Sequence, residues 1–245
     1  MAIDRESIAK QLYGQTGDAT SNVLTIPANL ESKNTSIVFD QNKANQILDD
    51  AGYARGGDGV RVTPGGVRMH VVFQTSTNSL RQKEQDLIKD GWQKIGIETE
   101  LKSVDASIYF SSDAGNPDTY SHFVTDVEMF TSSPDTPSPL LFMKRFYGRD
   151  PGTDFAQKSN NWSAPNMTKW SSDEYNQLFD SVKAETDLNK AASIWQKMND
   201  VAVNAYIVVP LVARKGTDAK SKGLQGPDPG PFDYFSWNIA DWTKA

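Results

Sequence analysis

The sequence contains no cysteine, which excludes thiol catalysis, disulfide bonds and thiolate metal sites. This absence suits a reducing cytosol and also a bacterial envelope protein built without disulfides, so it leaves the compartment open. Histidine is scarce too, because His70 and His122 are the whole imidazole supply. No Gly-x-Ser-x-Gly elbow or His-x-x-x-His pair accompanies either one, so we expect both, each in a predicted strand, to be structural or exposed, and we predict no metal site.

Basic clusters and long apolar runs are also missing. The formal net charge is −6, and no run of Lys and Arg offers the positive surface that nucleic-acid or membrane-surface binding requires. The longest nearly apolar stretch, residues 202–213, is too short to span a bilayer and contains Asn204 and Pro210. The opening residues, MAIDRESIAK, lack the apolar segment of a secretory signal. We therefore expect neither a nucleic-acid partner nor a membrane span.

The composition is that of a folded globular protein. Hydrophobic residues make up 38% of the chain, charged residues 23% and aromatic residues 10%, which is too apolar for disorder. A chain of 245 residues can bury a substantial core, either as one large domain or as two small ones.

The residues from Leu80 to Leu101 predict an amphipathic helix that runs directly into a strand. Apolar side chains recur at helical spacing on one face: Leu80, Leu87, Ile88, Trp92 and Ile95. Asn78 or Ser79 can cap the start of this helix, and Gly96 can adopt the left-handed conformation that ends it. The strand shows alternation, with Ile97, Thr99 and Leu101 against Glu98 and Glu100.

Other segments extend this α/β pattern. We expect a helix over 3–14 with Asp4 near its start, and a second helix that Asp40 caps and Gly52 ends, with Ala44, Ile47 and Leu48 on its apolar face. A hairpin over 60–75, a helical turn over 107–111 and a strand over 121–130 follow. A helix pair then begins at a capping box of Ser171 and Glu174 and continues after Asp187, before a closing strand over 207–212.

Taken in order, these segments resemble the C-terminal lobe of extracytoplasmic solute-binding proteins of the oligopeptide and dipeptide ABC-importer family, family 5. The segments that carry the resemblance are AIDRESIAKQLYG at 2–14, FDQNKANQILDDAGY at 39–53, the helix–strand unit at 80–101 and the helix pair at 169–200. The resemblance covers nearly the whole chain and preserves the order of its segments.

The resemblance implies a fold and an organisation. The fold would be the second lobe of a periplasmic-binding-protein-like clamshell, α/β in class, with helices packed on a mixed sheet around one core. Residues 1–214 would form this lobe, and residues 215–245 would be a tail that returns to an N-terminal lobe missing from this sequence. The chain would then be a fragment of a longer protein that is periplasmic or anchored at the cell surface.

The resemblance also implies a function without chemistry and without a cofactor. The whole protein would capture a peptide or a related small solute between two lobes and deliver it to an ABC permease in the membrane. The rival class is a glycan-active hydrolase, for which Asp126, Glu128 and Asp135 are candidate carboxylates. A protein-interaction module is a third class.

The loop-rich region 131–170 is the predicted ligand site, because exposed aromatic and polar side chains on loops can stack on and hydrogen-bond to a ligand. Together with the start of the long helix, it supplies the predicted ligand-binding residues Thr77, Asn78, Tyr120, Ser132, Ser133, Asp135, Trp162, Asn166 and Trp170. Asp135 would accept hydrogen bonds, Ser133 would be a weak donor, and the tryptophans would be stacking walls. A core role competes with the cleft role for Trp170 and, less strongly, for Trp162.

Two charged anchors of the family are absent in their expected form. Several short-peptide binders hold the ligand's amine with an Asp before the Pro-Asp pair and its carboxylate with an Arg just ahead of the long helix. Here residues 130–133 precede Pro134 and Asp135, and residues 74–77 precede Leu80, without either charge. A strict dipeptide ligand is therefore not favoured, and a longer peptide, a sugar-containing compound or an unrelated solute remains open.

Overall fold

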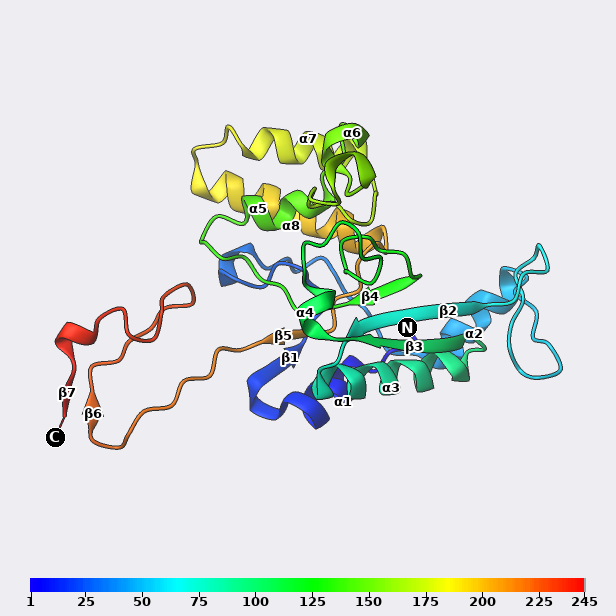
Figure 1. Cartoon of the computed structure of the whole chain (residues 1–245), viewed down its shortest axis with the longest axis horizontal. Helices are drawn as coiled ribbons and strands as arrows, with labels where there is room; N and C mark the ends of the chain where they lie inside the picture. The colour runs from blue at the N-terminus through cyan, green and yellow to red at the C-terminus, as the bar shows by residue number, and fades with distance from the viewer. Residues whose placement is uncertain (245) are drawn as a thin grey trace.

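A computed structural model describes residues 1–244, and its centre is a three-stranded parallel sheet in the order β3-β2-β4 (Figure 1). The strands are β2 (His70–Ser76), β3 (Glu98–Val104) and β4 (Val127–Met129). In register, Phe73 of β2 lies between Leu101 of β3 and Val127 of β4. Parallel order requires crossover connections, and the helix between β2 and β3 provides one.

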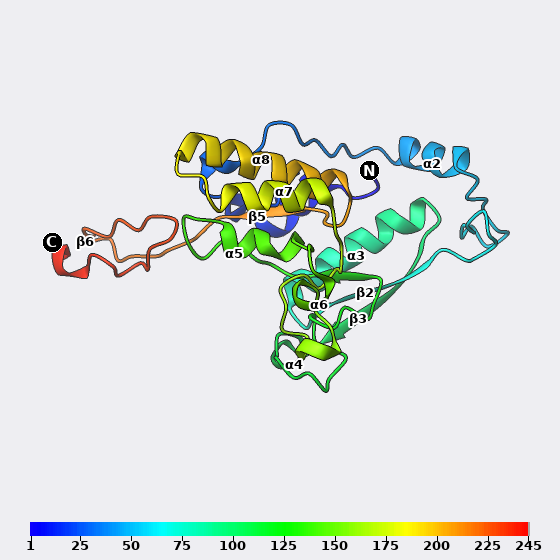
Figure 2. The same ribbon diagram turned by 90° about the horizontal axis from the view of Figure 1, so that it is seen from above.

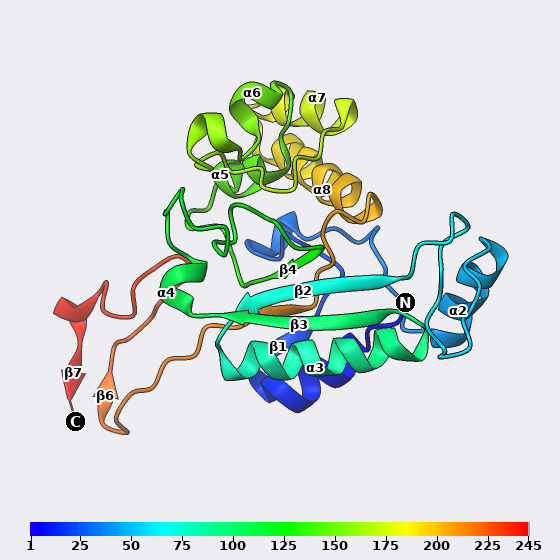
Figure 3. The same ribbon diagram turned by 45° about the vertical axis from the view of Figure 1, so that its right-hand side comes forward.

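That helix, α3 (Ser79–Lys94), lies along the sheet beside β3, as Figure 3 shows. Asn78 caps it by accepting from the backbone N–H groups of Leu80 and Arg81, and Gly96 follows with φ +86°. The helix, its cap and its left-handed end are therefore confirmed. The Phe73 and Trp92 rings pack with centroids 5.5 Å apart and fix the helix on the sheet.

A second group of helical elements consists of α7 (Asp173–Val182), α8 (Leu188–Asn204) and the short turns α5 (Leu140–Met143) and η4 (Lys144–Phe146), seen from above in Figure 2. The helices α5, α7 and α8 lie above the β4 edge of the sheet in Figure 1, whereas α3 lies below the sheet. The second helix of the pair begins after Asp187 as predicted, and Asp187 is its cap. The cap of α7 is Ser172, so the capping box at Ser171 is wrong by one residue. The Ser171 hydroxyl donates instead to the Gly148 carbonyl oxygen at 2.6 Å.

The remaining elements surround these layers. The N-terminal segment forms α1 (Arg5–Ile8), the π-helical turn η1 (Ala9–Tyr13), η2 (Gly14–Thr16) and β1 (Gly17–Ala19), which pairs antiparallel with β5 (Val212–Arg214). The other helical elements are η3 (Ala28–Leu30), α2 (Gln41–Asp50), α4 (Ala106–Tyr109), α6 (Pro151–Asp154), η5 (Lys158–Asn160) and η6 (Ile239–Asp241). The end of the chain pairs β6 (Leu224–Gln225) with β7 (Thr243–Lys244) and projects away from the rest of the molecule (Figure 1).

The α/β class is confirmed, but the expected mixed sheet is divided into a parallel sheet and separate antiparallel pairs. The core is divided as well. One cluster joins α7 and α8 to Leu24, Leu30 and the 140–146 turns, and another joins α1, the parallel sheet and α3; a smaller cluster lies under α2. Residues 207–212 pass from the first cluster to the second, because Ile207 and Val208 pack on one and Leu211 and Val212 on the other.

Three predicted β elements are shorter than expected. The strand predicted over 121–130 is reduced to β4, because residues 119–126 turn, Phe123 has φ +47°, and His122 lies in that turn rather than in a strand. The hairpin over 60–75 keeps only isolated bridges, since β2 takes the later residues into the parallel sheet. The strand predicted over 207–212 is also wrong, because β5 starts only at Val212.

Two apolar side chains face outward against the predicted helical faces. Leu87 of α3 is 37% exposed and Ile47 of α2 is 47% exposed, while their neighbours Ile88 and Ala44 are buried. Both helices lie at the edge of the fold, so each buries a narrower stripe than its sequence offers.

Candidate functional site

The candidate site lies at the carboxyl ends of β2 and β3. Open α/β sheets commonly bind ligands just outside the carboxyl ends of their strands. Thr77 follows β2 and donates its backbone N–H to the carbonyl oxygen of Val104, the last residue of β3, at 2.7 Å. This hydrogen bond joins the ends of the two strands. Both strand ends lie beside α4 (Figure 3). Asp105 caps α4 and so orients the aromatic residues that end this short helix.

Four aromatic side chains form a cluster at these strand ends. The Tyr120 ring is the hub, with its centroid 5.9 Å from Tyr109, 5.8 Å from Phe110 and 5.3 Å from Phe130. Tyr109 is fully buried, Phe110 is 42% exposed, and Tyr120 and Phe130 are half-buried. The cluster thus presents apolar ring surface to solvent on a rigid base, which suits stacking or apolar contact with a ligand.

Two arginines flank this cluster. The Arg81 guanidinium carbon lies 5.5 Å from the centroid of the Phe110 ring, and its Nη1 donates to the Ser76 hydroxyl at 2.7 Å. Arg145 donates from Nη2 to the Ser132 hydroxyl at 2.9 Å, and burial lowers its pKa from the ordinary arginine value. Among residues 1–244 neither guanidinium forms an ion pair with a carboxylate. We call the two arginines, the aromatic cluster and Ser132 the cleft face.

A half-buried carboxylate contacts the cleft face through Tyr109. The Glu128 carboxylate accepts from the Tyr109 hydroxyl at 2.8 Å, from the Thr125 hydroxyl at 3.0 Å and from Gln74 Nε2 at 3.2 Å. Gln74 is its partner across the β2–β4 register, and the Gln74 Oε1 atom is buried without a hydrogen-bond partner. Burial raises the pKa of Glu128 to about 7, although all three hydrogen bonds act in the opposite direction.

Of the predicted ligand-binding residues, Tyr120 and Ser132 belong to the cleft face, and Asn78 and Asp135 lie near its arginines. Tyr120 is the hub of the aromatic cluster, Ser132 binds Arg145, and Asn78 caps the helix that carries Arg81. Thr77, Ser133 and Asp135 are exposed. The negative charge of Asp135 acts on Arg145 and raises its pKa, against the effect of burial, so this acid lies near the cleft face.

Trp162 lies further along, on a loop that is tied to this region by a ring contact. Its ring is 4.3 Å from the His122 ring, and the Lys169 ammonium is 5.2 Å from its centroid. His122 is buried, with Nδ1 2.6 Å from the Thr119 hydroxyl oxygen. Asn161 and Trp162 both have positive φ, so this loop holds an uncommon backbone conformation in order to place the ring.

Asn166 and Trp170 serve the loop itself. Asn166 is 0% exposed, and its Nδ2 donates to the carbonyl oxygens of Tyr147 at 3.0 Å and Trp170 at 2.8 Å. The half-buried Trp170 ring packs edge-to-face on Tyr175, with centroids 5.5 Å apart, beside the α7–α8 core. These contacts give both residues a structural role, so they do not line the cleft face as free ligand-binding groups.

We expect Asn166→Ala to lower the free energy of unfolding by about 2 kcal/mol, because two buried carbonyl oxygens would lose their donor. Urea denaturation followed by circular dichroism measures this change. Asn204→Ala, at an exposed position at the end of α8, is the control and should change stability little. An Asn166→Ala variant as stable as the wild type would show that these hydrogen bonds do not hold the loop.

A second candidate carboxylate is also used within the fold. Asp126 Oδ2 accepts from the Val72 backbone N–H at 2.7 Å, so this carboxylate fastens the start of β4 to β2. Within residues 1–244, no group of three or more His, Asp or Glu side chains is arranged to hold a metal ion. None of the helices described is both long and apolar enough to cross a membrane.

The family model for bacterial extracellular solute-binding proteins, family 5, middle region, matches residues 1–154. This match covers more than half of the chain, so the protein belongs to family 5 of the bacterial extracellular solute-binding proteins. Members of this family bind substrates for transport.

Known proteins are similar to nearly the whole of this chain. Heme-binding protein A of Haemophilus influenzae is 24% identical over 237 residues, which cover 95% of this chain and 38% of that protein. The crystal structure of NikZ from Campylobacter jejuni in complex with Ni(L-His) matches with a TM-score of 0.74 at 19% identity, over 99% of this chain and 47% of that one.

The oligopeptide-binding protein AppA from Bacillus subtilis, solved with a nonapeptide, is also similar. It matches with a TM-score of 0.71 at 19% identity over 100% of this chain and 46% of that one. The chain therefore spans less than half the length of these relatives.

Sequence reasoning missed the two arginines of the cleft face. It looked for a family anchor in residues 74–77, whereas Arg81 lies in the first turn of α3. Nothing in the sequence distinguishes Arg145 from the other Lys and Arg residues of the chain. Only the fold places it beside Ser132. The sequence did contain a signal for Arg81. It lies three residues after the cap Asn78, in the first turn of the helix, and so close to the carboxyl end of the preceding strand.

Proposed function

We propose that this chain forms the lobe of a solute-binding protein of an ABC importer that contacts the solute through its cleft face. The observation that carries the proposal is a pair of arginines without carboxylate partners near a partly exposed aromatic cluster. A guanidinium that lacks an internal counter-ion can bind an anionic group of a ligand through charge-assisted hydrogen bonds.

A peptide longer than two residues fits this chemistry best. Its terminal carboxylate would bind a guanidinium, and an apolar or aromatic side chain would pack on Phe110 and Phe130. The exposed acid Asp135 could accept from the peptide's N–H groups or its ammonium group. The solute would be enclosed when a second lobe closes over this face, because its contacts favour the closed state.

Binding without chemistry is favoured over hydrolysis by the state of the carboxylates. Glu128 is already occupied by three donors, and Asp126 by a backbone N–H group. A glycan hydrolase needs two carboxyl groups that are free to act on one bond. Of the three candidate acids, only Asp135 is exposed without a hydrogen bond among the described residues.

The remaining partners follow from the same proposal. The complete protein would act outside the cytoplasm and present its closed form to a membrane permease. Residues 215–245 would pack on a second lobe; the exposed Tyr234, Trp237 and Ile239, at 88%, 58% and 61% exposure, are the side chains we expect it to cover. Exposed aromatic and large aliphatic side chains that lie close together are commonly found at protein interfaces.

The 245-residue chain alone should bind a peptide only weakly, because half of the enclosing surface would be absent. Each lost contact removes on the order of 1 kcal/mol, so the dissociation constant should lie in the millimolar range. Calorimetry with a pool of tripeptides to pentapeptides tests this expectation, and mass spectrometry of the pool tests for turnover. Cleavage of the pool, abolished in Asp135→Asn, would instead favour the hydrolase.

A further inference from the structure

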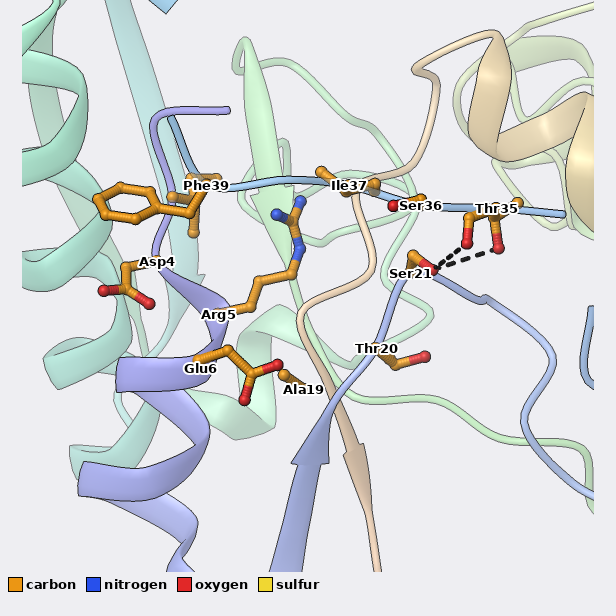
Figure 4. Close-up of a pocket in the computed structure, with 11 residues that line it drawn as sticks. Asp4, Arg5, Glu6, Ala19, Thr20, Ser21, Thr35, Ser36, Ile37 and Phe39 are labelled. Carbon is orange, nitrogen blue, oxygen red and sulfur yellow. Dashed lines mark hydrogen bonds between the residues drawn. The ribbon is translucent and has the colours of Figure 1, made fainter. Parts of the chain in front are cut away.

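A small pocket opens on a part of the fold that the cleft face does not use. Figure 4 shows it between the start of α1, the residues that follow β1, and the extended segment 35–39. Its volume is about 220 Å³, and Arg5, Thr20, Ser21 and Ser36 are among its lining residues. The pocket lies where chain segments distant in sequence meet, because Arg5 also reaches the residue Pro210 that leads to β5.

Arg5 is the residue that makes this pocket unusual. Its side chain is 6% exposed, and Nε donates to the Pro210 carbonyl oxygen at 2.6 Å. Within residues 1–244 its guanidinium forms no other hydrogen bond and no ion pair. Figure 4 shows the two remaining guanidinium nitrogens beyond the Nε contact, directed toward Ile37 and away from α1.

Arg61 shows how this protein otherwise treats a buried guanidinium. Arg61 is fully buried, and its Nη1 pairs with the Asp49 carboxylate at 2.6 Å while Nε donates to the Ile95 carbonyl oxygen at 2.8 Å. Its Nη2 donates to Asn45 Oδ1 at 3.0 Å. Arg5 is buried to a similar extent but lacks the counter-ion, and a buried charge without a partner is strongly destabilising. Arg5 is therefore a buried guanidinium without a counter-ion among residues 1–244.

The chemistry of the pocket selects among anions. With Nε already engaged, Nη1 and Nη2 are free side by side, which matches the two oxygens of a carboxylate. Asp4 and Glu6 also line the pocket, so a doubly charged phosphate would meet more repulsion than a singly charged carboxylate. Asp4 is partly neutralised, since its carboxylate accepts from the Ser7 backbone N–H and hydroxyl.

One hydroxyl at the rim can add a donor, because Ser36 lines the pocket and forms no side-chain hydrogen bond within residues 1–244. The Thr20 hydroxyl is turned away from Arg5 (Figure 4). We propose that Arg5 is the anchor of a carboxylate-binding site in this pocket, separate from the cleft face. The carboxylate comes either from a small solute or from an Asp or Glu side chain of the complete protein.

The test compares sodium acetate with sodium chloride at equal ionic strength on the 245-residue chain. Acetate should raise the thermal midpoint saturably, by about 2–4 °C at a tenfold excess over its dissociation constant. It should also shift the Arg5 Nε–Hε signal in ¹H–¹⁵N spectra, which needs no variant. Arg5→Gln should abolish the midpoint effect, and Arg5→Lys, which keeps the charge but loses the fork, should weaken it. Arg149→Gln, at an exposed arginine, should leave it intact.

Acetate that acts no differently from chloride on the wild type, or equally on Arg5→Gln, overturns the proposal. A second arm separates the two sources and rests on the proposed two-lobed protein. In a protein of the length of its relatives, the acetate effect disappears if a side chain fills the site and persists if a free solute does.

Discussion

Glu128→Gln is expected to raise the free energy of unfolding by about 2–3 kcal/mol at pH 8 and by less than about 1 kcal/mol at pH 5. The reason is the cost of holding a half-buried carboxylate in its charged form next to Tyr109 and Gln74. Burial raises the pKa of Glu128 to about 7, from an ordinary value of 4.5 in the unfolded chain. A difference of this size corresponds to roughly 3 kcal/mol at most.

The direction follows from proton linkage. Between about pH 4.5 and pH 7 the folded state binds more protons at Glu128 than the unfolded state does, so stability falls as pH rises through this window. Above it the full cost of the charge is present. Glutamine carries no charge and keeps an acceptor for the Tyr109 hydroxyl. Its amide can also donate to Gln74 Oε1, the buried atom that lacks a partner, if the Gln74 amide rotates.

The measurement is urea denaturation of both proteins at half-unit steps from pH 5 to pH 8.5. The difference between the two curves isolates Glu128, because groups such as Glu84, whose pKa is also raised by burial, are common to both. Glu174→Gln, at an exposed position of α7 without a side-chain hydrogen bond or ion pair among the described residues, is the control and should give a flat difference. A flat difference for Glu128→Gln as well would contradict the buried-carboxylate account.

Arg145→Gln is expected to weaken peptide binding by the complete two-lobed protein about 30- to 150-fold. Loss of a charge-assisted contact to a carboxylate in a water-excluded cleft costs about 2–3 kcal/mol. Arg145 is held in place by its Nε contact with the Phe142 carbonyl oxygen at 2.8 Å and by its position 4.3 Å from the Phe142 ring centroid. The guanidinium is thus oriented before a ligand arrives.

Calorimetry with one pentapeptide, carrying either a free or an amidated carboxyl terminus, tests this role. If Arg145 binds the terminal carboxylate, amidation and Arg145→Gln should each weaken binding and should not add when combined. Arg149→Gln, whose guanidinium is paired with Asp180 on the surface, should bind like the wild type. Additive losses would place the carboxylate on another residue, with Arg81 as the first alternative.

The elements predicted correctly are those whose signals are local. Asn78, the apolar stripe of α3 and Gly96 determine one helix and its ends through contacts within a few residues. The strand predicted over 121–130 is shortened to β4 because side-chain contacts decide the residues before it. The Thr119 hydroxyl contacts His122, and the Asp126 carboxylate accepts from the Val72 N–H group. Alternation of residue types carries no information about such contacts.

Some residues of the candidate site could also be predicted from local sequence, and others could not. Tyr120, Ser132 and Asp135 were predicted from the character of their loops, and the structure places them near one another. Arg81 and Arg145 could not be paired from the sequence, because only the fold brings their two segments to the same strand ends. Asn166 is of a residue type that commonly binds ligands, but this side chain is buried and hydrogen-bonded within its own loop, which is a structural role.

The most direct test of the account maps peptide binding on the ¹⁵N-labelled chain by ¹H–¹⁵N spectroscopy, using a defined pentapeptide at millimolar concentration. The account predicts concentration-dependent shifts concentrated at Arg81, Phe110, Tyr120, Ser132 and Arg145, with the peptide recovered uncleaved. Shifts centred on α7 and α8 instead, or none at the cleft face up to saturating peptide, would contradict it.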